Sequence, residues 1–81
     1  MKIETLIVEP RNGKKIATLV RRDGNLFIHY KGKFFEASHF IKGKLADVNH
    51  QNINQMFNTN DLRDVVAIKQ IILRAREEKF N

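Results

Sequence analysis

The sequence predicts a small α+β domain in which an antiparallel β-meander of three or four strands is packed by a long C-terminal α-helix. Three observations predict it. Turn-forming residues divide the first 37 residues into short apolar and β-branched runs. Residues 61–80 contain neither Gly nor Pro. A chain of 81 residues without Cys has room for one core and forms no disulfide. We therefore expect a basic meander over 1–37, an Asn-rich connection over 38–60 and an amphipathic helix over 61–80.

The strands of the meander are expected between three turn signals. Asn12-Gly13 follows the run 3–9, and Asp23-Gly24 separates the runs 15–22 and 26–31. Asn-Gly and Asp-Gly favour two-residue hairpin turns because both central positions of a type I′ turn have positive φ. A third break at 31–33 precedes Phe-Phe-Glu-Ala, which predicts a fourth strand ending at residue 37.

Period-two alternation predicts which residues of the third strand share a face. Leu26, Ile28 and Tyr30 fall on one face, and Phe27, His29 and Lys31 fall on the other. The second set combines an aromatic ring, an imidazole and a cation, which suits stacking of bases beside a held phosphate. The alternative is the half-covered face of an ordinary sheet. With Phe34, Phe35 and Phe40 nearby, most aromatic side chains of this region are expected in the core.

Residues 38–60 support two interpretations. The apolar residues between Leu45 and Phe57 recur at spacings of three to five, which predicts a short helix over 45–57. Many of the intervening residues are Asn, which lowers helix propensity. The alternative is a loop that the same apolar residues hold against the core.

The last segment predicts a helix over 61–80, with Thr59, Asn60 or Asp61 as its N-cap. Its apolar residues sweep an arc of roughly 220°, wider than the stripe of ~100° that covers one sheet. We therefore predict a homodimer in which a second copy covers the excess. The expected dimer interface is formed by Leu62, Val65, Ile68, Ile72 and Ala75.

The positive charge is confined to one half of the chain. Residues 1–44 carry ten Lys and Arg against four Asp and Glu, whereas residues 45–81 carry five against five. The entire net charge of +6 therefore lies in the first half. Such asymmetry indicates a surface for a polyanion, of which nucleic acid is the commonest. The alternative is that these cations keep a small sheet soluble and its edges unpaired.

The expected nucleic-acid contacts lie on the predicted sheet and its loops. Lys31-Gly32-Lys33 and Lys42-Gly43-Lys44 each place two ammonium groups beside a backbone that a phosphate can approach closely. RNA or single strands are favoured over duplex DNA because the C-terminal half is electrically neutral and the sheet is rich in aromatics. The predicted binding residues are Lys14, Lys15, Arg21, Arg22, Lys31, Lys33, Lys42 and Lys44, with His29 or Tyr30 stacking on bases.

No catalytic or cofactor motif is present, so we expect a non-catalytic protein without cofactor or metal. His29, His39 and His50 show no metal-ligand spacing, and no glycine-rich nucleotide loop occurs. The absence of a long apolar run and of a signal peptide predicts a cytoplasmic protein. The alternative function is a small protein-binding inhibitor or antitoxin-like factor of a phage or bacterium, which engages an acidic partner or a nucleic-acid-bound enzyme.

Overall fold

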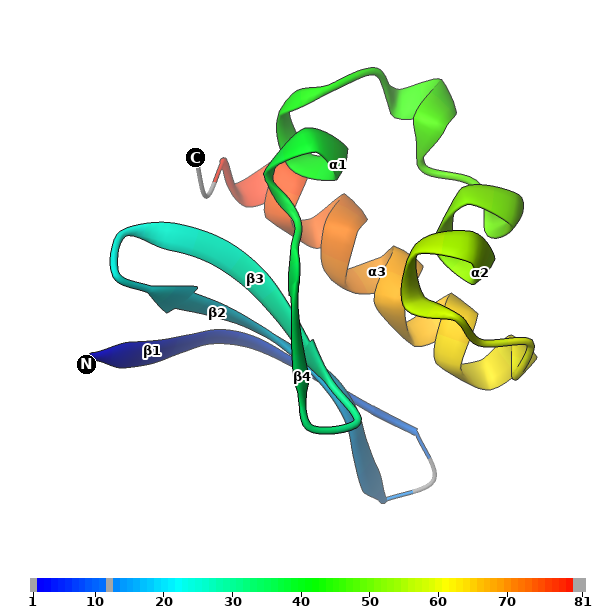
Figure 1. Cartoon of the computed structure of the whole chain (residues 1–81), viewed down its shortest axis with the longest axis horizontal. Coiled ribbons are helices and arrows are strands. Elements are labelled where there is room, and N and C mark those ends of the chain that lie inside the picture. The colour runs from blue at the N-terminus through cyan, green and yellow to red at the C-terminus, as the bar shows by residue number, and fades with distance from the viewer. Residues whose placement is uncertain (1, 12, 80–81) are drawn as a thin grey trace.

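The computed structural model describes residues 2–11 and 13–79, and these form the expected α+β fold (Figure 1). A four-stranded antiparallel sheet has the order β1-β2-β3-β4, which is a meander. Its strands are β1 (Ile3–Arg11), β2 (Lys14–Arg22), β3 (Asn25–Tyr30) and β4 (Lys33–Glu36). The helices α1 (Ser38–Lys42), α2 (His50–Phe57) and α3 (Leu62–Glu78) follow, with a 3-10 turn, η1 (Leu45–Asp47), between the first two.

The hairpin turns form where Gly supplies the second of two positive φ angles. Asp23 and Gly24 have φ of 51° and 85°, and Lys31 and Gly32 have φ of 50° and 77°. Positive φ at both central residues is the signature of the type I′ turn. Arg22 therefore pairs with Asn25, and Tyr30 pairs with Lys33. The third expected turn includes Asn12, which lies outside the described residues, although the flanking strands pair as expected.

The strand register sets which side chains share each face of the sheet. Ile7, Leu19, Ile28 and Phe35 form one cross-strand row on the face that meets the helices. Thr18, His29 and Phe34 form a row on the opposite face. The alternation predicted for the third strand is confirmed, because Leu26, Ile28 and Tyr30 are buried while Phe27 and His29 are half-buried.

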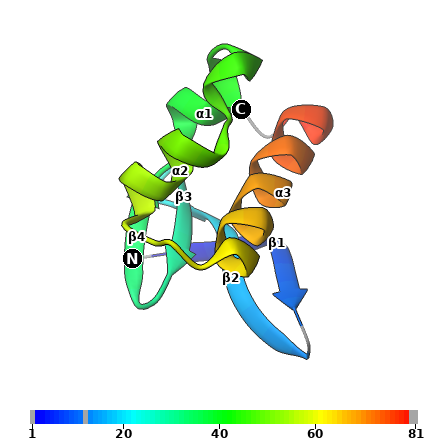
Figure 2. The ribbon, with the colours of Figure 1, turned by 90° about the vertical axis from the view of Figure 1, so that its right-hand side faces the viewer.

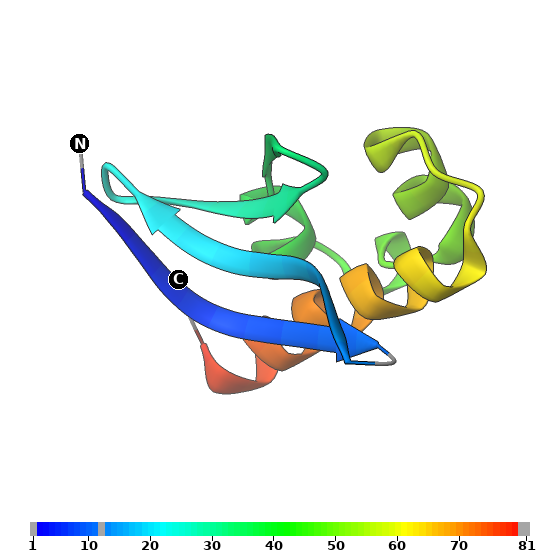
Figure 3. The same cartoon turned by 90° about the horizontal axis from the view of Figure 1, so that it is seen from below.

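The helices of the described residues lie on one side of the sheet (Figure 2). Figure 3 shows α3 running alongside the curved ladder of β1 and β2. The expected short helix is present as α2, capped by the side chain of Asn49, which accepts a hydrogen bond of 2.9 Å from the backbone N–H of Asn52. The expected C-terminal helix is α3, and its N-cap is Asp61. The predicted end of this helix, Phe80, lies outside the described residues.

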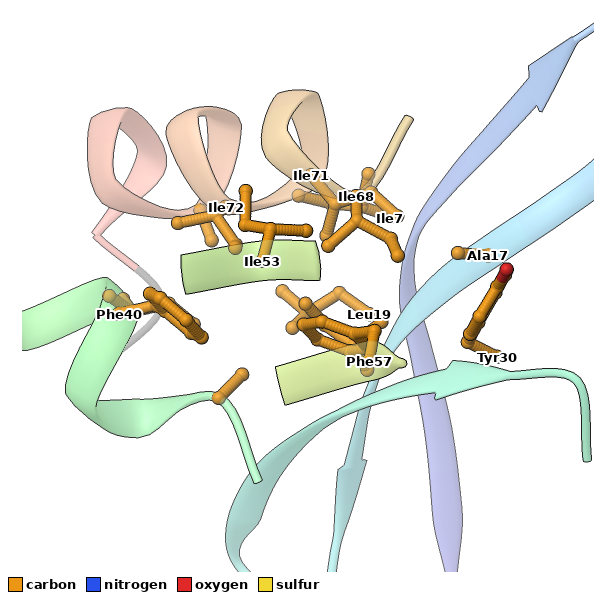
Figure 4. Packing of buried hydrophobic residues seen from close by; sticks show 14 of the residues in the cluster. Ile7, Ala17, Leu19, Tyr30, Phe40, Ile53, Phe57, Ile68, Ile71 and Ile72 are labelled. Atoms are coloured by element: carbon orange, nitrogen blue, oxygen red, sulfur yellow. The ribbon is translucent and has the colours of Figure 1, made fainter. Parts of the chain in front are cut away.

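Most of the wide apolar arc of α3 is covered by the chain itself, although Leu62 and Val66 stay exposed. Besides the sheet, both α1 and α2 pack against α3, so its apolar side chains meet Phe40, Ile53 and Phe57 in one core (Figure 4). Four of the five residues predicted to form a dimer interface are buried in this core and are unavailable to a second copy: Val65, Ile68, Ile72 and Ala75. The interface prediction is wrong for these four, because it counted only one sheet as cover. Leu62 is 63% exposed.

Two polar contacts fix the helices to each other and to the sheet. The hydroxyl of Tyr30 donates a hydrogen bond to the carboxylate of Asp64 in the first turn of α3. Near the other end of α3, Nη1 of Arg76 lies 2.7, 3.2 and 2.9 Å from the backbone carbonyl oxygens of Phe40, Ile41 and Gly43. The helical layer is therefore fastened at both ends of α3. None of the described helices covers the opposite face of the sheet (Figure 2).

Candidate nucleic-acid interface

The face of the sheet that no described helix covers, here called the open face, carries a group of aromatic side chains. Phe27 and His29 on β3 and Phe34 on β4 project from it at alternating strand positions. The rings of His29 and Phe34 are stacked, with centroids 4.6 Å apart and planes at 15°. Phe27 meets Phe34 edge-on at 6.3 Å and 85°. We call these three side chains the aromatic row.

A guanidinium group completes the row at one end. The Cζ atom of Arg22 lies 4.9 Å from the ring centroid of Phe27 and 4.6 Å from that of Phe34. These distances are within the range of cation–π attraction, which holds the guanidinium against the rings. The positive charge of Arg22 is thus placed directly beside flat apolar surface.

The β2 side chains on the open face are buried although no described helix packs on them. Thr18 and Val20 on β2 are only 4% and 3% exposed. Each lies directly opposite a residue of the aromatic row, since Thr18 pairs with His29 and Val20 pairs with Phe27. The large side chains of β3 and β4 therefore cover the small ones of β2 and give the row a packed support.

Lysines gather at the other end of the row, where β2 begins and β3 ends. A hollow of about 120 Å³, here called the lysine hollow, is lined by Lys15, Ile16, Ala17, Thr18, His29 and Lys31. Lys33 lies in the same turn as Lys31, but it faces the helical side, where both line a hollow of about 270 Å³ with Phe35 and Phe57. Lys14 is exposed at the start of β2.

The remaining predicted cations are not on this face. Arg21 points to the opposite side, where its Nη1 is 3.0 Å from Oε1 of Glu4. The two Lys-Gly-Lys segments lie far apart (Figures 1 and 2). The first segment forms the turn between β3 and β4, whereas Lys42 and Lys44 flank the end of α1 at the other end of the molecule (Figures 1 and 2).

Tyr30 does not meet the expectation that it stacks on bases. Its side chain lies in the core, only 3% exposed, and its hydroxyl is bound to Asp64. Burial raises the pKa of this hydroxyl above its ordinary value of 10, and the adjacent carboxylate of Asp64 raises it further. Tyr30 is therefore a structural residue.

Phe34 is the site residue that the sequence analysis did not identify. Adjacent residues of a strand point to opposite faces, so Phe34 and Phe35 cannot both face the helices. Phe35 takes the core side, with its ring centroid 4.6 Å from that of Phe57. The Phe-Phe pair indicated that one of the two rings faces away from the helices. The pairing of His29 with Phe34 shows that this ring is Phe34.

Comparison with known proteins gives no relative: no protein-family model matches the sequence, and neither characterised proteins nor solved structures match it significantly. Over residues 2–11 and 13–79, no three His, Asp or Glu side chains group as metal ligands would. Among the described helices, none combines the length and apolar character needed to cross a bilayer. The open face is therefore interpreted from its own geometry.

Proposed function

We propose that the protein binds single-stranded nucleic acid on the open face of its sheet. The observation that carries the proposal is the aromatic row, in which the stacked pair of His29 and Phe34 adjoins Phe27 and Arg22 on a surface that no described helix covers. Bases stack on such rings with ~1–3 kcal/mol each, whatever their sequence. The function is binding without catalysis.

The arrangement suits single strands better than a duplex. Stacking on a protein ring requires a base whose face is free, and in a duplex both faces are occupied by neighbouring base pairs. The side chains of the aromatic row are half-buried, so part of each ring is open to solvent. Splayed bases of a flexible strand reach such a surface, whereas the base edges within a groove do not.

Cations beside the row supply the contacts to phosphate. Arg22 lies at one end, and Lys15 and Lys31 lie at the other. Three phosphate contacts give a dependence of affinity on salt with a slope of about −0.7 per contact, so the affinity falls about twentyfold between roughly 50 and 200 mM salt. We expect this loss for a fluorescently labelled decamer of uridine, measured by anisotropy, and for the thymidine equivalent.

The direct test removes one ring from the face. Phe34→Leu keeps an apolar side chain but removes the ring against which His29 and Arg22 pack, and we expect it to weaken binding at least about fivefold. Phe35→Leu is the matched control, because it makes the same change at the next residue, on the helical side of the same strand. Circular dichroism establishes that both variants are folded before they are compared.

Two results would contradict the proposal. Equal binding by the two variants would show that the open face is not the contact surface. If the wild-type protein binds neither polymer at low salt, the basic half instead serves an acidic protein partner, and capture of partners after nuclease treatment identifies it.

A further inference from the structure

The hollow of about 270 Å³ on the helical side, here called the aromatic hollow, is separate from the open face. It lies between the turn from β3 to β4 and the end of α2, and three aromatic rings line it: Tyr30, Phe35 and Phe57. Asn58, the left-handed C-cap of α2, and the two lysines of the turn complete the lining. The aromatic row and the aromatic hollow therefore lie on opposite faces of the sheet.

The three rings form one connected apolar surface. The ring centroid of Phe35 is 4.6 Å from that of Phe57 and 6.4 Å from that of Tyr30. Tyr30 and Phe57 are each only 3% exposed, whereas Phe35 is half-buried. The buried contacts hold the rings in place, and the open part of Phe35 offers a surface on which a further ring can pack. Because this surface is formed in advance, little ordering of side chains opposes the binding of a ligand.

Two ammonium groups adjoin this apolar surface without a negative partner. Nζ of Lys31 lies 5.4 Å from the ring centroid of Tyr30, within the range of cation–π attraction, which directs the lysine toward the hollow. Lys33 lines the same hollow from the start of β4. Among the described residues, no carboxylate lines the hollow and neither lysine forms an ion pair. The hollow therefore combines apolar rings with two charges that an anion would neutralise.

The residue type at position 31 indicates that this lysine has a role beyond the turn. Lys31 has a φ of 50°, and positive φ is adopted mainly by Gly, Asn and Asp. The equivalent position of the preceding hairpin is held by Asp23, with a φ of 51°, which follows that preference. A lysine at this position strains the backbone and places an ammonium group beside the ring of Tyr30. A binding role for the ammonium group accounts for this choice of residue.

The size and charge of the hollow define the class of ligand. Its volume of about 270 Å³ is just below the ~300–1,000 Å³ of pockets that hold drug-sized molecules, so it suits a single ring system. Two lysines favour a carboxylate or, more strongly, a phosphate, which carries about 1.5 to 2 negative charges at pH 7. We propose that the aromatic hollow binds a small aromatic anion, which is a ring that carries a phosphate or a carboxylate group. The ring packs on Phe35, and the acidic group meets Lys31 and Lys33.

The test uses phenyl phosphate, phenol and methyl phosphate as probes in NMR titrations of the ¹⁵N-labelled full chain. Phenol lacks the charge of phenyl phosphate, and methyl phosphate lacks the ring. We expect phenyl phosphate to bind about tenfold more tightly than either, because an aromatic contact and a charge-assisted hydrogen bond each contribute up to about that ratio. The amide shifts should centre on Tyr30, Phe57 and Asn58. Equal affinities for phenyl phosphate and methyl phosphate, shifts centred elsewhere, or no binding at millimolar concentrations would overturn the inference.

Two pairs of variants locate the site, once circular dichroism has established that each is folded. Phe35→Leu is expected to weaken binding of phenyl phosphate about fivefold, whereas Phe34→Leu on the open face should leave it unchanged. Lys33→Gln is also expected to weaken it about fivefold. Lys42→Gln removes the same charge from the end of α1 and should have no effect. Equal effects within either pair would overturn the assignment to the aromatic hollow.

A nucleotide of a bound strand also carries a ring and a phosphate, and the uridine decamer separates this source from a free ligand. We expect the decamer and phenyl phosphate to bind together, with the amides of Phe57 and Asn58 responding only to phenyl phosphate. Loss of phenyl phosphate binding at saturating decamer would assign the hollow to the strand and overturn a separate site. If the decamer does not bind at all, the proposed function fails, and the phenyl phosphate titration still decides this inference.

Discussion

The hydrogen bond between Tyr30 and Asp64 joins the sheet to the first turn of α3, and its removal should be costly. The two side chains are 3% and 7% exposed, so neither finds water in place of its partner. Tyr30→Phe removes the donor and leaves the carboxylate buried. A hydrogen bond to a charged group contributes about 1.5–3 kcal/mol, so its loss from a domain of this size lowers the melting temperature by roughly 6–24 °C. Asp64→Asn retains an acceptor and is expected to cost less.

The ionisation of Tyr30 at alkaline pH can be followed by its absorbance without interference, because Tyr30 is the only tyrosine and the chain has no tryptophan. Burial and the Asp64 carboxylate raise the pKa of Tyr30 in the folded protein above 10. The protonated hydroxyl is therefore favoured by folding, and its contribution is complete below pH 10 and is lost as the pH rises through the folded pKa. Wild-type stability should fall over that range, and the Tyr30→Phe variant should lack this part of the fall.

Thermal unfolding at pH 7 measures the loss of stability in Tyr30→Phe. A titration of tyrosinate absorbance, with and without denaturant, compares the pKa of Tyr30 in the denatured and the folded protein. The pH at which half of Tyr30 is ionised should be higher in the folded protein than in the denatured protein. A Tyr30→Phe variant within about 0.5 kcal/mol of wild type, together with equal midpoints, would refute the reasoning, since surface substitutions have effects of that size.

Two further predictions concern the helical layer. Arg76→Met should lower the free energy of unfolding by about 1.5–3 kcal/mol, because three backbone carbonyls at the end of α1 lose their charged donor. Chemical denaturation measures this loss. An unchanged denaturation midpoint would mean that α1 is held in place without the arginine. Ile68→Ala should cost about 2–5 kcal/mol because this side chain is fully buried, whereas Leu62→Ala at an exposed position should cost under 1 kcal/mol. Equal losses in the two variants would contradict the burial of α3 within one chain.

The meander was predictable because its signals are local. Asp23-Gly24 and Lys31-Gly32 set two turns by their own backbone preferences, and alternation along β3 follows from strand geometry alone. The helix α1 was missed because its five residues carry no pattern of their own. Contacts from elsewhere hold it in place: the N–H of Ala37 bonds to Leu26, and Arg76 binds its last carbonyls.

The site was predictable only in part, for the same reason. Alternation placed Phe27 and His29 on one face, but the third ring, Phe34, joins them through the register of β3 with β4. Lys42 and Lys44 resembled Lys31 and Lys33 in sequence, yet the fold places them in another layer. The homodimer was inferred from an apolar arc whose cover, α1 and α2, is apparent only in three dimensions.

The central claim is that single-stranded nucleic acid lies on the open face, and its most direct test is NMR mapping of the bound surface. ¹⁵N-labelled protein is titrated with a uridine decamer that has hydroxyl ends. The account predicts that the largest amide shifts cluster at Val20, Phe27, His29 and Phe34, with little change in α1, α2 and α3. Shifts concentrated on the helical layer, or none at saturating oligonucleotide, would contradict it.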